Sequence, residues 1–503
     1  MEVLVAAGAW AMSPISNYLS TQAGSRLFPR YENSTFESNL FEQLSSSAHV
    51  YFPGSEGFNA STTRWSTLDA PNVTITVEVA NEADVVEVVK FANEHGKPYL
   101  VVNNGHGAIT TVGKLQNGVQ IWMRQLNSVA IAPDSQTATF GGGILAKDVT
   151  DGLWAAGKQT VTGACECVSL LGAGLGGGHG WLQGRHGLVS DQFVSLNMVM
   201  ADGTLQTIDQ NHELWWAMRG AGHNFGIVTS VTSKIYDVEH PNWAFQMLVF
   251  TGDKVEGLYT NINEELLRNG TQPVDIMHFS VFINNPALDP VNPVIILFIL
   301  QEGVDVVDVK YTQSFTALGP ILAQAESGDY RDLPRWTAMA KNDDVCKKHG
   351  LANTRFPIDI QAYDIPAQKK VFDVFASAIK DTPALNSSLF LFEGYSVQGV
   401  KSVPPQDTAY PFRESNLLLA PVVAYKEDGE QLAKKAEALG EELREILHQA
   451  SGQKELRTYV NYAFGTEGVK SMYGYEQWRQ DRLHALKKKY DPQGKFSFYA
   501  PIA

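Results

Sequence analysis

The sequence predicts an α+β (α/β) protein with more than one domain. Residues 73–79 alternate apolar and polar side chains as a strand does, an apolar helical stripe follows at 82–95, and a buried strand is expected at 99–102. Strand-like runs alternate with helical segments along the rest of the chain. With 503 residues, 44% of them hydrophobic and 18% charged, the chain is long enough for roughly two to four domains and a large core.

Each short element of the first half ends at a residue suited to a cap or a turn. Asn81 is suited to cap the helix at 82–95, and Gly96 to end it. Further strands are expected at 119–123, 129–131, 137–140, 193–200, 205–208 and 226–236, and helices at 147–156 and 214–218. A dense glycine zone at 163–187 lies between these elements.

Residues 240–455 contain fewer glycines and longer elements. Strands are expected at 245–250 and 294–300, and a long helix at 428–450. The last segment is expected to form a strand, a helix and a tail. The predicted divisions are therefore a lead-in over 1–64, a first domain over 65–238, a second domain over 239–455 and a C-terminal segment over 456–503.

Charge and cysteine content exclude several classes of function. The net charge of −15 argues against nucleic acid or an anionic membrane surface as the main partner. No apolar run reaches the roughly 18 residues that span a bilayer. Three cysteines are too few for a disulfide scaffold or a four-cysteine iron–sulfur cluster. A zinc site at Cys165 and Cys167 is disfavoured because structural zinc sites usually contain CxxC pairs, so no metal is predicted.

The N-terminus has some features of a secretory signal. Residues 3–12 have the length of its apolar region, although Glu2 stands where a basic residue belongs, so an ordinary apolar N-terminus is the alternative. Glycosylation sequons occur at Asn33, Asn59, Asn72, Asn269 and Asn386. We expect a secreted protein or one of the secretory pathway.

Two small-residue loops are candidates for backbone contact with a ligand. Residues 172–177 satisfy GxGxxG, but the four glycines that follow disfavour the helix of a dinucleotide-binding turn. Glycines set among apolar residues allow backbone to approach a ligand, and their N–H groups can bind a diphosphate; a flexible loop is the alternative. The second loop, 103–107, directly follows the strand at 99–102.

The order of these motifs resembles a known family. The matching runs are NGHG at 104–107, GACECV at 163–168, GGGHG at 176–180, RHGLVSD at 185–191, MADG at 200–203, LWWAMRGAGHNFGIV at 214–228 and YVNY at 459–462. They resemble the PCMH-type FAD-binding domain of the vanillyl-alcohol-oxidase superfamily, and within it the fungal berberine-bridge-enzyme-like branch. The resemblance covers roughly 65–238 and 456–503; the middle matches mainly by length and by AYPFR at 409–413.

The resemblance implies the fold and the cofactor. The fold would be an FAD-binding domain of two α/β subdomains, plus a substrate domain whose large antiparallel sheet is covered by helices. FAD would be attached twice, through His106 to the 8α-methyl group and through Cys165 to C6. The other implied cofactor-binding residues are Asn104, Gly105, Gly107, Ala108, Gly163, Val168, Ser169, Gly172, Gly177, Gly178, Gly180, Ile227, Val228, Asn461 and Tyr462.

The catalytic base is harder to assign. In the family it lies on a central strand shortly after a Pro-His-Arg motif, which here reads Pro-Phe-Arg at 411–413, and the expected position falls near Pro421, which cannot be a base. The replacement candidates are Tyr462, then His179, with Tyr395 and Glu393 behind them. A tyrosine base would need a pKa lowered from roughly 10 by a neighbouring positive charge.

The resemblance implies an FAD-dependent oxidase for a small alcohol, phenolic or secondary metabolite, with molecular oxygen reduced to hydrogen peroxide. Gly163 favours an oxidase because a bulky side chain there would block oxygen. The alternatives are a carbohydrate (oligosaccharide) oxidase, a flavin-dependent cyclase or dehydratase without net oxidation, and a flavoprotein without catalysis. We expect a monomer or weak dimer; whether Cys167 pairs with Cys346 stays open.

Overall fold

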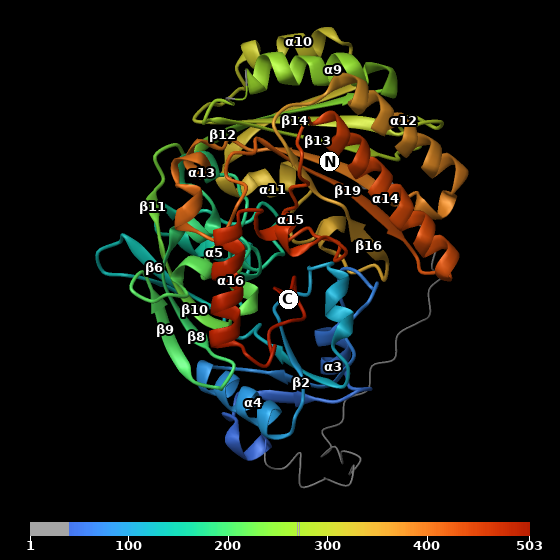
Figure 1. Ribbon diagram of the computed structural model, residues 1–503. Helices are drawn as coiled ribbons and strands as arrows, with labels where there is room; N and C mark the ends of the chain where they lie inside the picture. Colours follow the sequence, from blue (N-terminus) through green and yellow to red (C-terminus); the bar gives the residue numbers. More distant parts are fainter. Residues whose placement is uncertain (1–39, 269, 271, 503) are drawn as a thin grey trace, which may run out of the picture.

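The computed structural model describes residues 40–268, 270 and 272–502, and Figure 1 shows their arrangement. The apolar stretch 3–12 and the sequons at Asn33 and Asn269 lie outside the described residues. Among the described residues no helix has the length and apolar character needed to cross a membrane. The predicted boundaries near residues 64, 238 and 455 stay predictions.

The first layer is a four-stranded sheet. Its order is β1 (His49–Tyr51), β2 (Val73–Glu78), β4 (Gly118–Trp122) and β3 (Tyr99–Val102), with only β1 antiparallel to its neighbour. α4 (Glu82–Glu94) packs its buried valines on this sheet and begins at Asn81, which forms a capping box with Asp84. Residues of the expected lead-in take part, since β1 and α3 (Glu56–Thr62) both contact β2.

The second layer is a five-stranded antiparallel sheet. Its order is β5 (Val129–Ile131), β6 (Thr137–Gly141), β10 (Ile227–Lys234), β8 (Phe193–Val199) and β9 (Leu205–Asp209). The small pair β7 (Lys158–Gln159) and β11 (Tyr236–Asp237) and the helices α5 (Ala146–Trp154) and α8 (Trp215–Met218) accompany it. The glycine zone contains two short helices, α6 (Leu170–Gly174) and α7 (Gln183–His186).

The third layer is an eight-stranded antiparallel sheet. Its order is β15 (Leu322–Asp329), β12 (Asn242–Phe250), β14 (Val294–Glu302), β13 (Ile276–Ile283), β18 (Leu389–Gly394), β19 (Leu417–Tyr425) and β16 (Ala352–Arg355), with β17 (Ile358–Ile360) paired to β19. The helices are α9 (Val255–Asn261), α10 (Gln313–Ala317), α11 (Leu333–Trp336), α12 (Ile365–Asp381), α13 (Gln398–Ser402) and α14 (Glu430–Ala450). Figure 1 shows α9, α12 and α14 over the outer face.

The side-chain alternation of β19 sorts the two faces of this sheet. Leu417, Leu419 and Val423 pack into the cluster beneath α12 and α14. Leu418 and Val422 belong to clusters with residues of the first half and the C-terminal segment. One face of the large sheet therefore forms a core with its helices, and the other faces the rest of the molecule.

The C-terminal segment contains α15 (Val469–Tyr473) and α16 (Gln477–Tyr490) but no strand among residues 456–502. The prediction of a strand in this segment was therefore wrong. Residues 459–463 form turns instead, with the Tyr462 N–H donating to the Tyr459 carbonyl, and Thr110 donating from both its backbone N–H and its hydroxyl to the Phe464 carbonyl. The polar groups of residues 459–464 thus bind locally and to Thr110. Residues of α15 and α16 pack into the core cluster that contains the strands of the second layer.

Candidate functional site

A cavity of ≈ 330 Å³ is enclosed by residues of both α/β layers, the large sheet and the C-terminal segment. Seventeen residues predicted from the sequence line it: Asn104, Gly105, His106, Gly107, Ala108, Gly163, Cys165, Val168, Ser169, Gly172, His179, Ile227, Val228, Glu393, Tyr395, Asn461 and Tyr462. Motifs separated by more than 300 residues in the sequence therefore meet in one place.

Three glycines predicted to bind the cofactor, Gly177, Gly178 and Gly180, do not line the cavity. An added Cβ at Gly177 would lie 2.6 Å from the Tyr410 ring, and one at Gly180 would lie 1.8 Å from the Thr162 carbonyl oxygen. The positive φ angles of Gly177 and Gly178 also favour glycine. Packing and backbone conformation explain these three glycines, and the geometry gives them no contact with the cavity.

His106 is held as a neutral imidazole on the cavity wall. Its Nε2 is 3.0 Å from the Val345 carbonyl oxygen, and its ring stacks on Trp65 with centroids 4.8 Å apart and planes 14° apart. Because a carbonyl can only accept, Nε2 carries the proton and Nδ1 keeps the lone pair. Burial, followed by the charge of Arg355, lowers the pKa of His106 to about 4. The ring is therefore a neutral nucleophile at pH 7.

Cys165 is the free cysteine of the described residues, because Cys167 and Cys346 form a disulfide. The Cys165 sulfur lies 3.3 Å from that of Cys167 and 3.5 Å from that of Cys346. A ring nitrogen of His106 lies within 4.8 Å of the sulfurs of Cys165 and Cys167. Burial raises the pKa of the Cys165 thiol to about 11, and the charge of Arg355 opposes this rise. The His106 ring and the Cys165 sulfur thus stand side by side, the sulfur as a thiol that becomes nucleophilic when it loses its proton. The disulfide removes one of the thiols that a metal would need.

Several buried polar atoms of the cavity wall have no partner among the described residues. They are the Tyr99 hydroxyl, Asn103 Oδ1, His223 Nδ1 and Asn461 Oδ1. Buried polar groups are nearly always hydrogen-bonded in folded proteins. A ligand with many polar atoms along its length would satisfy such a set.

A carboxyl group and two tyrosines form the polar centre of the substrate-domain wall. The Tyr462 hydroxyl donates to Glu393 Oε1 at 2.9 Å, and the Tyr395 side chain also hydrogen-bonds Glu393. Burial raises the pKa of Glu393, while these hydrogen bonds and the charge of Arg355 oppose the rise. Burial and the charge of Glu393 raise the pKa of Tyr462 well above its usual value. Glu393 is therefore the better proton acceptor of the pair, and Tyr462 the better relay.

His179 is fixed at both ring nitrogens. Nδ1 lies 2.9 Å from Gln183 Oε1 and Nε2 lies 2.9 Å from the Tyr410 hydroxyl. Since the amide oxygen accepts, Nδ1 carries the proton and Nε2 accepts from Tyr410. Burial lowers the pKa of His179 to about 4. With both nitrogens engaged, His179 orients its neighbours and has no lone pair left for a substrate proton.

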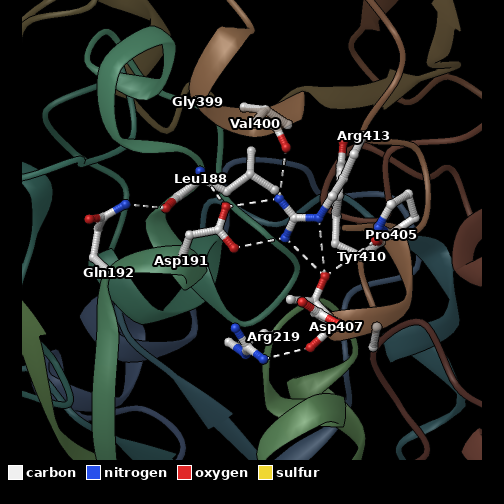
Figure 2. A network of polar contacts seen from close by, with 12 residues as sticks. Leu188, Asp191, Gln192, Arg219, Gly399, Val400, Pro405, Asp407, Tyr410 and Arg413 are labelled. Atoms are coloured by element: carbon white, nitrogen blue, oxygen red, sulfur yellow. Dashed lines mark hydrogen bonds and ion pairs between the residues drawn. The ribbon is translucent and has the colours of Figure 1, made fainter. Parts of the chain in front are cut away.

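A buried ion pair lies next to Tyr410 (Figure 2). Arg413 binds both carboxylate oxygens of Asp191, at 2.9 and 2.7 Å, and the two side chains are only 1% and 5% exposed. Arg413 also donates to the Val400 carbonyl. The Arg219 side chain donates to the Asp407 carbonyl, and the Arg219 backbone carbonyl accepts from the Tyr410 N–H. The AYPFR motif is thus tied to the glycine zone by charge-assisted hydrogen bonds.

Strand β19, where the family's catalytic base is expected, presents no basic or acidic side chain to the cavity. Pro421 lies between Ala420 and Val422 on β19, and Val422 packs on the cavity side, so Pro421 points to the helix side. The cavity-side row of β19 is Leu418, Ala420 and Val422, which are all apolar. Glu393 of β18 stands directly opposite Leu418. The carboxyl group of this site therefore comes from the neighbouring strand.

Arg355 lines the cavity and was not predicted from the sequence, and Trp65, which contacts it, was not predicted either. The guanidinium carbon of Arg355 lies 4.4 Å from the ring centroid of Trp65 and 4.4 Å from that of Tyr462. Arg355 is the last residue of β16 and has no motif around it. It supplies the positive charge near Tyr462 that a tyrosine base was expected to need.

Comparison with known proteins now assigns the family. Residues 73–209 match the model described as "FAD binding domain", and 458–503 match "Berberine and berberine like". The chain is 50% identical over 503 residues, covering 100% of both chains, to "FAD-linked oxidoreductase chyH" of Penicillium rubens. It is 52% identical over 476 residues, 92% of this chain and 94% of the relative, to "FAD-linked oxidoreductase chry5" of Gibberella zeae.

Solved structures share the fold. BBE-like 1 of Physcomitrella patens has a TM-score of 0.79 at 20% identity, covering 93% of this chain and 100% of that one. The xylooligosaccharide oxidase of Myceliophthora thermophila has a TM-score of 0.78 at 19% identity, covering 93% and 99%. The predicted fold class is confirmed.

The cavity fits FAD. It is lined by small-residue loops, by four buried polar atoms that lack partners, and by two adjacent nucleophiles. The fold, the two family models and a full-length relative agree with this fit. The chain belongs to the berberine-bridge-enzyme-like family of FAD-linked oxidoreductases.

Proposed function

We propose that this enzyme is an FAD-dependent oxidase that removes a hydride and a proton from a small organic alcohol, phenolic compound or secondary metabolite and returns the electrons to molecular oxygen as hydrogen peroxide. The observation that carries the proposal is that the Tyr462–Glu393 pair and the nucleophiles His106 and Cys165 line one cavity. Proton acceptor and cofactor anchor are thus in one enclosed site.

FAD is attached at two residues in this proposal. His106 offers Nδ1 because Nε2 is bound to the Val345 carbonyl, and it stays neutral because of burial. Cys165 offers its sulfur because the other two cysteines are paired with each other. The disulfide favours Cys165 over Cys167 as the second attachment.

Tyr462 and Glu393 take the substrate proton. The substrate O–H donates to the Tyr462 oxygen as the Tyr462 proton passes to Glu393, so that the carboxylate is the final acceptor over the 2.9 Å contact. The charge of Arg355 favours the transient phenolate. Bound FAD supplies the hydride acceptor and the reaction with oxygen. Gly163 leaves the cavity wall beside Cys165 without a side chain.

Acid denaturation of the purified holoprotein tests the attachment. We expect the yellow colour to stay with the precipitate, and peptides containing His106 and Cys165 to carry flavin. His106→Ala and Cys165→Ser should each leave a single attachment. Free flavin released from the wild type would refute double attachment.

Peroxide release with aromatic alcohols tests the reaction, and oligosaccharides test the second candidate, a carbohydrate oxidase. The fold is shared with the xylooligosaccharide oxidase. The substrate wall here includes the buried phenolic side chains of Tyr395 and Tyr459 and the partly buried aliphatic side chain of Leu391. This wall favours a small metabolite. A product of unchanged oxidation state without peroxide would instead indicate a cyclase or dehydratase, and failure of every substrate to bleach the flavin would indicate a binding protein.

The proposal includes passage through the secretory pathway. A disulfide is typical of oxidising compartments, and the sequon residues Asn59, Asn72 and Asn386 are exposed. A mass decrease on treatment with an N-glycosidase, for protein made in a fungal host, would support it. The monomer or weak dimer stays a prediction for sedimentation measurements.

A further inference from the structure

Arg355 occupies an unusual place in the cavity wall. Its guanidinium group contacts the rings of Trp65 and Tyr462, each with a carbon-to-centroid distance of 4.4 Å. Trp65 in turn stacks on His106. The cation thus stands in a series of stacked contacts that joins the cofactor anchor to the proposed proton relay.

The donors of Arg355 have no acceptor within the described part of the chain. No hydrogen bond or ion pair within 4.0 Å reaches its guanidinium among the described residues, and the cavity carboxyl group, Glu393, is engaged by the Tyr462 hydroxyl instead. The contacts with the two aromatic rings are cation–π contacts, and they leave the N–H donors of Arg355 without an acceptor in this part of the chain. These donors lie in the guanidinium plane, so an acceptor approaches at the edge of that plane.

The expected cofactor does not supply the acceptor. Arg355 lies near enough to His106 and Cys165 to affect both, and these are the residues proposed to hold the dimethylbenzene edge. A dimethylbenzene edge carries no hydrogen-bond acceptor. The donors of Arg355 are therefore free for a second ligand.

We infer that Arg355 binds a carboxylate of the substrate, an inference that rests on the proposed function. A planar guanidinium edge matches a carboxylate through two parallel hydrogen bonds. The net charge of −15 gives the protein as a whole no attraction for anions, so the attraction must come from cations of the cavity wall, of which Arg355 is the one that contacts Tyr462. Because Arg355 stacks on Tyr462 itself, the group that loses its proton lies within a few bonds of the carboxylate. The substrate class is a small organic acid with a nearby hydroxyl or amine.

Spectral titration of the holoprotein at pH 7 tests this assignment, with benzoate and its neutral isostere benzamide as probes. The readout is the perturbation of the flavin absorbance, which needs no turnover. We expect wild-type protein to bind benzoate about 10–100-fold more tightly than benzamide, as for one charge-assisted contact. Arg355→Met should abolish the preference, and Arg355→Lys should retain part of it, since the charge stays but the fork is lost.

Lys369→Met is the matched control. It removes one positive charge from an exposed side chain of α12, where Lys369 pairs with Asp373, and it should leave both probe affinities unchanged. Melting temperature and flavin content show whether each variant is folded. If Arg355→Met does not fold, the wild-type comparison and Arg355→Lys decide.

Equal affinity of the wild type for benzoate and benzamide, or a benzoate preference that survives Arg355→Met, would overturn the inference. The outcome is separable from that of the proposed function. Benzoate preference with no peroxide from any substrate would leave the anion site intact and refute the oxidase. Peroxide production without benzoate preference would do the opposite.

Discussion

The two walls of the cavity present different parts of the polypeptide. The wall formed by residues 103–108 and 163–172 offers backbone, small side chains and two nucleophiles. The second wall, formed by residues of β16, β18 and residues 459–462, offers long polar and aromatic side chains such as Arg355, Glu393 and Tyr462. The first wall suits a nucleotide cofactor, which is held by backbone groups. The second wall suits discrimination between substrates, because each of its contacts depends on one side chain.

The largest effect is expected from the substrate wall. Tyr462→Phe should lower the rate of anaerobic flavin reduction by about 10³-fold, and Glu393→Gln by about 10²-fold, because the proton relay is lost. Both variants should retain covalent flavin if the walls are functionally separate. Tyr475→Phe is the control, since the Tyr475 hydroxyl donates only to the Leu456 carbonyl. Stopped-flow absorbance measures the rates; a wild-type rate in Tyr462→Phe would exclude the relay.

The next largest effect is expected at the buried ion pair of Arg413 and Asp191, which lies outside the two walls. Arg413→Met should lower the free energy of unfolding by about 3–5 kcal/mol, because the buried Asp191 carboxylate loses its partner. Asp191→Leu combined with Arg413→Met should recover much of that loss, since a buried ion pair can be replaced by apolar groups. Denaturant titration measures both. A loss below 1 kcal/mol in the single variant would mean that solvent reaches the pair.

A third prediction uses a carboxyl group in the row of Glu393. Asp359 and Glu393 both stand opposite Leu418, and neither Asp359 oxygen has a partner among the described residues. Burial raises the pKa of Asp359 to about 8. Between about pH 4 and pH 8 the folded state therefore holds a proton that the unfolded chain has lost. The free energy of unfolding is highest below about pH 4, and it declines by up to about 1.4 kcal/mol per pH unit as the pH rises to about 8.

Asp359→Asn should remove that decline and make the protein more stable than the wild type at pH 8. Melting temperatures measured from pH 4 to pH 8 check it. Parallel profiles for the two proteins would show that Asp359 is hydrated. Asp359 would then differ from Glu393, whose pKa is raised by burial in the cavity wall.

The smallest effect is expected on the cofactor wall. Gly163→Ala adds a Cβ that would lie 2.9 Å from a Val168 methyl group, beside Cys165. We expect reoxidation by oxygen to slow about tenfold, a barrier increase of about 1.4 kcal/mol, with anaerobic reduction unchanged. Gly468→Ala, where the added Cβ meets nothing within 4 Å, is the control. Equal slowing of both half-reactions would mean that the substitution displaces the cofactor.

The cofactor wall could be predicted from the sequence because its residues are contiguous. His106 and Cys165 stand in glycine-containing runs, and a small-residue loop after a strand has a local signature. Gly177, Gly178 and Gly180 share that signature for a different reason, close packing, which sequence alone does not separate from ligand contact. Helix α4 was predicted closely because its cap and apolar stripe are local as well.

The substrate wall could be predicted only in part, because its geometry depends on strand register. Glu393 and Tyr395 were among the candidates, but their position relative to Tyr462 follows from the pairing of β18 with β19. The alternation of side chains turns Pro421 away from the cavity, and a shift of one residue would have reversed this. Arg355 and Trp65 stand in no recognisable sequence motif. Their place beside the site follows from a contact between side chains that are far apart in the sequence.

The disulfide between Cys167 and Cys346 has a consequence for biogenesis. It joins residues 179 positions apart. The short 3₁₀ helix Asp344–Cys346, which contains one of its cysteines, also supplies the Val345 carbonyl that orients His106. Oxidation of these thiols should therefore precede flavin loading during maturation. Protein made in a reducing cytosol would keep three thiols near His106, whose imidazole would have no fixed tautomer. We expect such material to emerge pale from the expression host, and to yellow only after oxidative refolding with FAD.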